Sequence, residues 1–225
     1  MWKAFINLLF PRTCILCNTL LLPEETVACL ACVHTLPGLE LPAEQRALQQ
    51  TFAGRLPVQH AYAWLHFRKG SVVQQLLHET KYGGRPEIGQ WCGMHMGRRW
   101  KEQGTLPPVL LVVPVPLHPR RLRERGFNQS EEIARGLCAE TGWELHTGNL
   151  VRTVYARSNT RRNRWARMQQ MQNSFTLLEP AKLEGRHVLL LDDVLTTGAT
   201  MEACAEQLCR SSLQSFNVAA LARTL

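Results

Sequence analysis

Two adjacent carboxylates stand between an apolar run and a threonine-rich turn in VLLLDDVLTTGATMEA, Val188 to Ala203. The apolar run, Val188 to Leu191, predicts a buried strand of a parallel sheet. Asp192 and Asp193 then fall at the carboxyl end of that strand, where open α/β sheets place their ligands. The turn can surround an anion, and a helix expected from about Ala199 directs unpaired N–H groups at the same place. This chemistry suits a sugar phosphate, because carboxylates accept hydrogen bonds from vicinal hydroxyls.

Two other interpretations of this segment are weaker. A strand, turn and helix with a merely polar turn would leave two carboxylates at a buried strand end without a use. A nucleotide hydrolase also ends an apolar strand in Asp to bind magnesium. That class needs a G-x-x-x-x-G-K-[ST] loop upstream, and no such sequence occurs in the chain.

A second group of reactive side chains lies near the start, where four cysteines follow the pattern C-x2-C-x11-C-x2-C. Each C-x2-C places two thiolates on one side of a tight turn, and two such turns complete a tetrahedral zinc site. Disulfides would require an oxidising compartment, and a redox C-x-x-C would normally be single. We therefore expect one structural Zn²⁺, bound by Cys14, Cys17, Cys29 and Cys32.

Composition and charge restrict the class of protein. An apolar content of 45% can build a core, and no apolar run approaches the length of a membrane span. Met1 to Phe10 lacks a small-residue cleavage site, so we do not expect a signal peptide. We expect a cytoplasmic protein with reduced cysteines and no membrane insertion.

The net charge of +8 is concentrated in two segments. Residues 120–125 hold four arginines against one glutamate, and residues 152–167 hold six arginines and no acid. Nucleic acid or a polyanionic small molecule would account for this basicity. A solvated surface is the alternative, although such surfaces normally mix both signs.

Strands alternate with helices along most of the chain, which favours an α/β fold with a mostly parallel sheet. Expected strands cover 60–67, 109–115, 150–153, 174–177, 188–191 and 216–221. Expected helices cover 71–82, 87–102, 129–141 and about 199–210, with a short one around 43–52. The domains expected are a zinc-finger module at 1–35, a linker at 36–59 and a ligand-binding α/β domain at 60–225.

The segment from Val188 resembles the signature of type I phosphoribosyltransferases, which bind 5-phosphoribosyl-1-pyrophosphate (PRPP). VVPVPLHPRRLRERGFNQS, residues 112–130, is similar to a segment of ComF/GntX-type proteins, which are bacterial proteins of natural transformation and DNA utilisation. An N-terminal cysteine finger, R-G-F-N-Q and a PRPP motif occur in that order. His78, Lys81, Tyr82 and Gly83 also resemble that family's helix ending in L-K-Y-x-G.

The resemblance implies a type I phosphoribosyltransferase-like fold and two loops that face the ligand. The PRPP loop would comprise Asp192, Asp193, Thr196, Thr197, Gly198 and Thr200. A pyrophosphate- or anion-binding loop would run from Val115 to Asn128, its fixed core including Arg125, Gly126, Asn128 and Gln129. Magnesium would enter with PRPP. In the family, partners are helicase-like and recombination proteins of the uptake machinery.

The segment ARSNTRRNRWARMQQMQNSF, residues 156–175, departs from the family's T-Q and R-x-x-N-x-x-x-A-F pattern. In phosphoribosyltransferases this loop closes over the reacting pyrophosphate, so the departure bears on turnover more than on binding. In an enzyme, Asp192 and Asp193 would be the catalytic residues, fixing the ribose while magnesium and arginines neutralise the departing pyrophosphate. No base-binding segment is recognisable.

Two functions therefore stand side by side. The first is an accessory protein of DNA uptake and utilisation, which binds PRPP or a related ligand and also single-stranded DNA. Its DNA-binding residues would be Arg157, Arg161, Arg162, Arg164, Trp165 and Arg167, because arginines grip phosphates and an aromatic ring stacks on bases. The alternative is a phosphoribosyltransferase of nucleotide salvage, in which the arginines serve pyrophosphate. The sequence favours the first and leaves open whether the protein is an enzyme.

Overall fold

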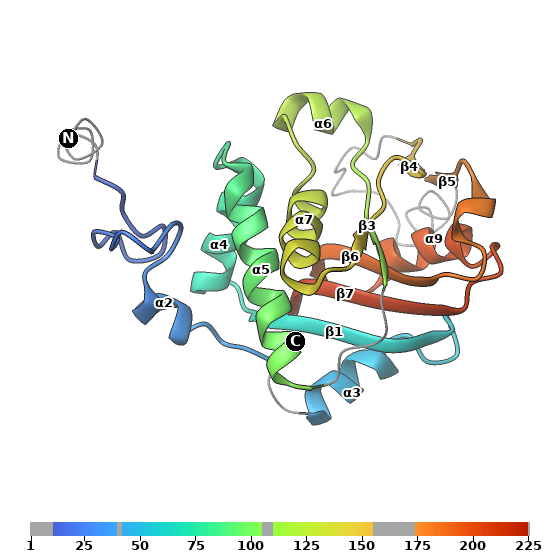
Figure 1. Ribbon diagram of the computed structural model, residues 1–225, viewed down its shortest axis with the longest axis horizontal. Coiled ribbons are helices and arrows are strands. Elements are labelled where there is room, and N and C mark those ends of the chain that lie inside the picture. The colour runs from blue at the N-terminus through green and yellow to red at the C-terminus, as the bar shows by residue number, and fades with distance from the viewer. Residues whose placement is uncertain (1–10, 40–41, 105–109, 155–173, 225) are drawn as a thin grey trace.

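A five-stranded parallel sheet forms the centre of the computed structural model, which describes residues 11–39, 42–104, 110–154 and 174–224. The strand order is β1-β7-β6-β2-β3, and Figure 1 shows β1, β7 and β6 side by side. Every neighbouring pair in this sheet is parallel. The strands are β1 (Val58–Phe67), β2 (Leu111–Pro114), β3 (Glu144–Leu145), β6 (His187–Leu195) and β7 (Ser215–Thr224). The parallel α/β fold expected from the sequence is thus confirmed.

Alternation along the strands builds an apolar core on each face of the sheet. Tyr62 and Trp64 of β1 point into one core, whereas Ala61 and Ala63 point into the other. This division follows from the two-residue period of a strand. Most of β6 and β7 is buried, as expected for strands covered on both faces.

Helices α4 (Val72–Tyr82), α5 (Pro86–Glu102) and α7 (Gln129–Thr141) cover one face (Figure 1). Glycines let α5 and α7 pack unusually closely. A Cβ at Gly93 would lie 1.9 Å from the Ile133 carbonyl oxygen, and a Cβ at Gly136 would lie 1.9 Å from that of Gln90. Neither position can accept a side chain unless the two helices separate.

The opposite face is covered by α3 (Pro42–Gln50) and α9 (Ala199–Leu208). Residues 36–59, for which the sequence suggests a linker, supply Leu39, Leu48 and Phe52 to the core on this face. The proposed domain boundaries themselves stay a prediction.

Three smaller parts complete the described chain. Strands β4 (Leu150–Arg152) and β5 (Phe175–Leu177) form an antiparallel pair, followed by a 3-10 turn at Pro180–Leu183. A short helix, α6 (Pro119–Arg125), precedes α7. The cysteine segment contains α2 (Leu30–His34), and its Ile15 carbonyl accepts a hydrogen bond of 2.6 Å from Gln75 Nε2 on α4.

The structure differs from the sequence prediction at two places near the ligand edge. β6 continues beyond Leu191 to Leu195, because β7 is long enough to keep pairing with it as far as Arg223. Residues 119–125, expected as part of a loop, form α6; it begins at a proline, a favoured first helical residue, and ends at Gly126 with φ of 86°. No helix in the described ranges combines the length and apolar character needed to cross a bilayer.

Candidate functional site

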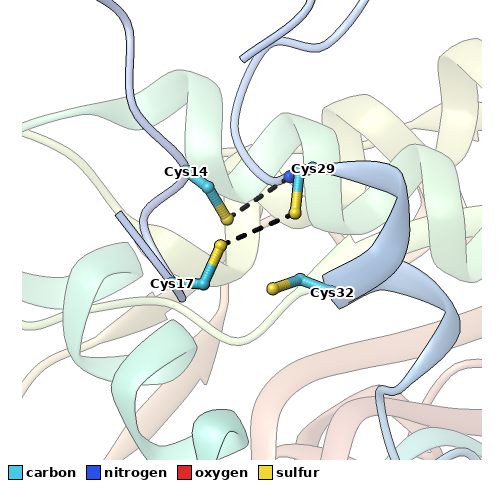
Figure 2. Close-up of side chains that lie close together, drawn as sticks. All are labelled: Cys14, Cys17, Cys29 and Cys32. Carbon is cyan, nitrogen blue, oxygen red and sulfur yellow. Dashed lines mark hydrogen bonds between the residues drawn. The ribbon is translucent and has the colours of Figure 1, made fainter. Parts of the chain in front are cut away.

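The four cysteines predicted to bind zinc converge in the N-terminal module (Figure 2). Their sulfur atoms all lie within 4.8 Å of one another. Four thiolates around one Zn²⁺ at about 2.3 Å would place the sulfurs about 3.8 Å apart. The arrangement therefore fits a tetrahedral structural zinc site after only a small contraction.

Backbone and side-chain donors already surround this cluster. The N–H groups of Leu16 and Cys29 donate to Cys14 Sγ at 3.4 and 3.3 Å, as is usual around metal-bound thiolates. The Thr19 hydroxyl, 2.9 Å from Cys17 Sγ, lowers the pKa of the Cys17 thiol to about 6. Burial raises the pKa of Cys32 well above its ordinary value. All four side chains would become metal ligands together, so no open position would be left for catalysis.

The carboxylate pair lies where two neighbouring strands part. β2 leaves the sheet after Pro114, which pairs with Leu191, so Asp192 and Asp193 have no strand on that side. The helices that follow β2 and β6, α7 and α9, cover opposite faces. Such a switch point is where open parallel sheets form a ligand crevice.

Both carboxylates are buried, with 9% of Asp192 and 6% of Asp193 exposed. Asp192 Oδ1 accepts a hydrogen bond of 2.9 Å from the Ser130 hydroxyl and one of 2.8 Å from the Asp193 N–H. The Lys81 ammonium lies 2.5 Å from Asp193 Oδ2, as an ion pair whose geometry is not that of a hydrogen bond. The pair is therefore held from α4 and α7 before any ligand binds.

Burial, and after it the neighbouring charge of Asp193, raise the pKa of Asp192 to about 7. The N–H of Asp193, the Ser130 hydroxyl and the Lys81 charge partly oppose this rise, because each favours the ionised carboxyl. A carboxyl that changes charge near neutral pH is typical of a functional site. An ionised carboxylate only accepts hydrogen bonds, so the protonation state of Asp192 decides which groups it can bind.

The loop between β6 and α9 presents its polar groups to solvent. Thr196 and Thr197 are exposed, and Thr200 is half-buried in the first turn of α9. Gly198 adopts φ of 83° at the start of α9 and has no side chain to cap that helix end, although the Ala199 N–H donates to the Thr197 hydroxyl at 3.5 Å. Phe52 packs beneath the turn, where a Cβ at position 198 would lie 3.0 Å from its Cε1. The remaining N–H groups of the first turn and the hydroxyls could together bind a phosphate.

The predicted anion loop leads directly into α7. The Asn128 side chain donates to the Val115 carbonyl at 3.0 Å and accepts from the Ser130 N–H at 3.2 Å, so it joins the end of β2 to the start of the helix. Gln129 is buried and its side-chain oxygen accepts a hydrogen bond from Arg125. Asn128 and Gln129 of the R-G-F-N-Q motif thus fix the start of α7, from which Ser130 reaches Asp192.

Arg152, counted in the sequence only as part of a basic segment, also lies at this edge. Its guanidinium stands 5.2 Å from the Phe175 ring centroid, and its buried Nε has no hydrogen-bond partner in the described part of the chain. Burial lowers the pKa of Arg152, as does the charge of Arg121, whereas the charge of Asp192 opposes this. A desolvated arginine with a free donor beside a carboxylate pair is suited to an incoming anion.

The structure brings the predicted carboxylates and PRPP loop together at one edge of the sheet, and Asn128 and Gln129 support them from α7. The predicted DNA-binding residues at 157–167 lie outside the described residues. Sequence reasoning missed three contributions: the Ser130 hydroxyl, the Lys81 ion pair and Arg152. Lys81 lies far from the other site residues along the chain, and only its place in the L-K-Y-x-G-like segment could have indicated it.

Comparison with known proteins agrees with this geometry. Residues 123–224 match the phosphoribosyl transferase domain. The chain is 31% identical over 160 residues to the DNA utilization protein YhgH of Escherichia coli K12, covering 68% of each protein. It is 29% identical over 234 residues to the Salmonella typhimurium LT2 protein of that name, covering 96% of this chain and 98% of the relative. It is 32% identical over 117 residues to Competence protein F of Haemophilus influenzae, covering 50% of this chain and 49% of the relative.

Two solved structures to which the chain shows a weaker similarity are the following. An allosteric regulatory enzyme of purine biosynthesis is 18% identical, with a TM-score of 0.42, covering 64% of this chain and 30% of that one. A hypoxanthine phosphoribosyltransferase from Staphylococcus aureus is 16% identical, with a TM-score of 0.38, covering 69% and 73%.

Proposed function

The chain belongs to the ComF/GntX family of phosphoribosyltransferase-like proteins, and on that premise we propose that it is a cytoplasmic accessory protein of DNA uptake and utilisation. It binds PRPP or a related phosphoribosyl ligand at the carboxylate pair and also binds single-stranded DNA. The observation that carries the ligand proposal is the buried pair Asp192 and Asp193 in the last part of β6, just before the loop that leads into α9.

The ligand would be divided between these two parts of the site. Asp192 and Asp193 would accept hydrogen bonds from the ribose hydroxyls, and Thr196, Thr197, Gly198 and Thr200 would surround the 5-phosphate. Arg152 would neutralise further phosphate charge. Magnesium prefers oxygen ligands, and here the diphosphate would supply most of them, so the ion would enter with PRPP.

The test of ligand binding is calorimetry with PRPP and Mg²⁺. The double change Asp192→Asn and Asp193→Asn should abolish measurable binding while the circular dichroism spectrum stays that of the wild type. The control is Glu206→Gln, which removes a carboxylate from an exposed position of α9 and should leave PRPP binding unchanged. Undiminished PRPP affinity in the double variant would show that the site is misassigned.

The test of DNA binding is the salt dependence of affinity for an unstructured oligonucleotide. The logarithm of affinity should fall linearly with the logarithm of salt, with a slope of roughly −0.7 per phosphate contacted. Neutralising Arg161, Arg162 and Arg164 should flatten that slope by roughly two units and hardly change PRPP affinity. A wild type with no measurable binding at moderate salt would remove DNA from the proposal.

The second candidate function is a phosphoribosyltransferase, which the match of residues 123–224 to the phosphoribosyl transferase domain favours. Release of pyrophosphate from PRPP with a panel of bases separates the two functions. Turnover with one base, lost in the triple arginine variant, would establish the enzyme.

A further inference from the structure

A cavity of about 440 Å³ opens between the end of α4 and α6. It is lined by Lys81, Tyr82, Gly84, Arg121, Glu124 and Arg125. Lys81 connects it with the phosphoribosyl site, because the same ammonium forms the ion pair with Asp193. The cavity is therefore adjacent to the ribose position yet built by different side chains.

Tyr82 gives the cavity an aromatic surface that the fold does not use as core. Its residue is 67% exposed. The Arg125 guanidinium lies 5.3 Å from the ring centroid, and the His78 ring lies 5.0 Å away, tilted by 44°. Arg125 is itself held by the Gln129 side chain. The ring is thus oriented by its neighbours but remains accessible, as a stacking surface must be.

The charge of the cavity is not balanced by its own side chains. Glu124, its only acid, forms an ion pair with Arg120 at 3.0 Å, and Lys81 is paired with Asp193. Neither Arg121 nor Arg125 has a carboxylate partner among the residues described. Two guanidinium groups on one short helix repel each other, and a phosphate between them would relieve that repulsion.

We propose that this cavity binds one nucleotide unit, with its base stacked on Tyr82 and its phosphate on Arg121 and Arg125. A pyrophosphate would have no use for the exposed ring, and a bare base would have none for two unpaired guanidinium groups. A nucleotide uses both, and 440 Å³ lies within the range of small-ligand pockets. This nucleotide site rests on the proposed function, because it is placed next to the proposed phosphoribosyl site. A free mononucleotide and one unit of single-stranded DNA share this chemistry.

The experiment measures affinity for thymidine monophosphate and for a short oligothymidylate in four variants. Tyr82→Leu should weaken binding about fivefold or more, because it removes stacking, whereas Tyr82→Phe should stay close to the wild type. Arg121→Gln should weaken binding about tenfold. Arg123→Gln is its matched control, since it removes the same charge from the same helix outside the cavity, and it should cost less than about twofold.

The two ligands identify the source of the nucleotide. Losses with thymidine monophosphate indicate a free nucleotide, and losses confined to the oligonucleotide indicate DNA; both support the proposal. An oligonucleotide carrying 5-iodouracil should also crosslink to the peptide that contains Tyr82. Equal effects of Arg121→Gln and Arg123→Gln, or no effect of Tyr82→Leu on either ligand, overturn the proposal. If the nucleotide proposal fails in this way but PRPP binding still depends on Asp192 and Asp193, the proposed binding of PRPP is unaffected. A wild-type protein that binds neither thymidine monophosphate nor the oligonucleotide also refutes the nucleotide site, and it does not bear on PRPP binding.

Discussion

The cysteine cluster and the carboxylate site are built in opposite ways. The cluster is made by one stretch of 19 residues, Cys14 to Cys32, whose thiols converge on a common point. The carboxylate site is assembled from elements far apart in the chain: Lys81 from α4, Ser130 from α7, Arg152 from β4 and the carboxylates from β6. The first should depend on a metal ion and the second on helix packing, so different changes should break each.

The largest effect should come from separating the two helices that support the carboxylate site. Gly136→Ala would place a methyl group against the Gln90 carbonyl, which is backbone and cannot turn aside. We expect a loss of about 4 kcal/mol or more in the free energy of unfolding, measured by urea titration, and weaker PRPP binding because α7 carries Ser130.

Gly97→Ala is the control for this prediction, since it meets only side-chain atoms of Glu140 and Leu137 at 3.1–3.2 Å. It should cost less than about 1 kcal/mol, because those side chains can move and alanine favours a helix. Equal stability of the two variants would mean that close packing of α5 on α7 does not hold the site.

The next largest effect concerns the cysteine cluster and its zinc content. Cys29→Ser should reduce the zinc content of the purified protein from about one ion per chain to none, measured by elemental analysis. Limited proteolysis should then cleave the segment around residues 14–32 first, while PRPP affinity stays within about twofold of the wild type. Cys209→Ser, outside the cluster, should keep its zinc. Wild-type zinc content in Cys29→Ser would refute the four-thiolate site.

A third effect concerns the buried charge of Asp192. Its folded pKa of about 7 lies above the ordinary value, so the unfolded chain ionises first as pH rises. The carboxyl therefore costs no stability below about pH 4, costs progressively more up to about pH 7, and costs a constant amount above that. Asp192→Asn should be more stable than the wild type by roughly 2–3 kcal/mol at pH 8 and by clearly less at pH 5. An equal difference at both pH values would contradict the raised pKa.

The contrast between the two regions also explains how far the sequence could be read. The two C-x2-C pairs are a local sequence signal for a metal site, and in the structure their four sulfur atoms lie close together. The strand from Val188 and the turn after it are local signals too, and both are found in place. By contrast, Ser130 and Lys81 reach the carboxylates only through tertiary packing, which no periodicity records. Gly89, Gly93 and Gly97, which recur every four residues in α5, are the sign of a close helix contact that the sequence does carry.

The smallest effect should come from the Ser130 hydroxyl, which connects α7 with the carboxylate pair on β6. Ser130 donates to Asp192 at 2.9 Å and favours the ionised carboxyl. Ser130→Ala removes that donor, so the pKa of Asp192 should rise further and the acid limb of PRPP binding should move upward by about half a pH unit. Stability should fall by only about 1 kcal/mol, as for one hydrogen bond.

Calorimetry with PRPP from pH 6 to pH 9 would measure the midpoint of the acid limb of binding. Ser130→Thr keeps a hydroxyl at this position and is expected to show the wild-type profile. A midpoint that moves downward, or that Ser130→Thr fails to restore, would show that α7 does not act on the carboxylates through this hydrogen bond.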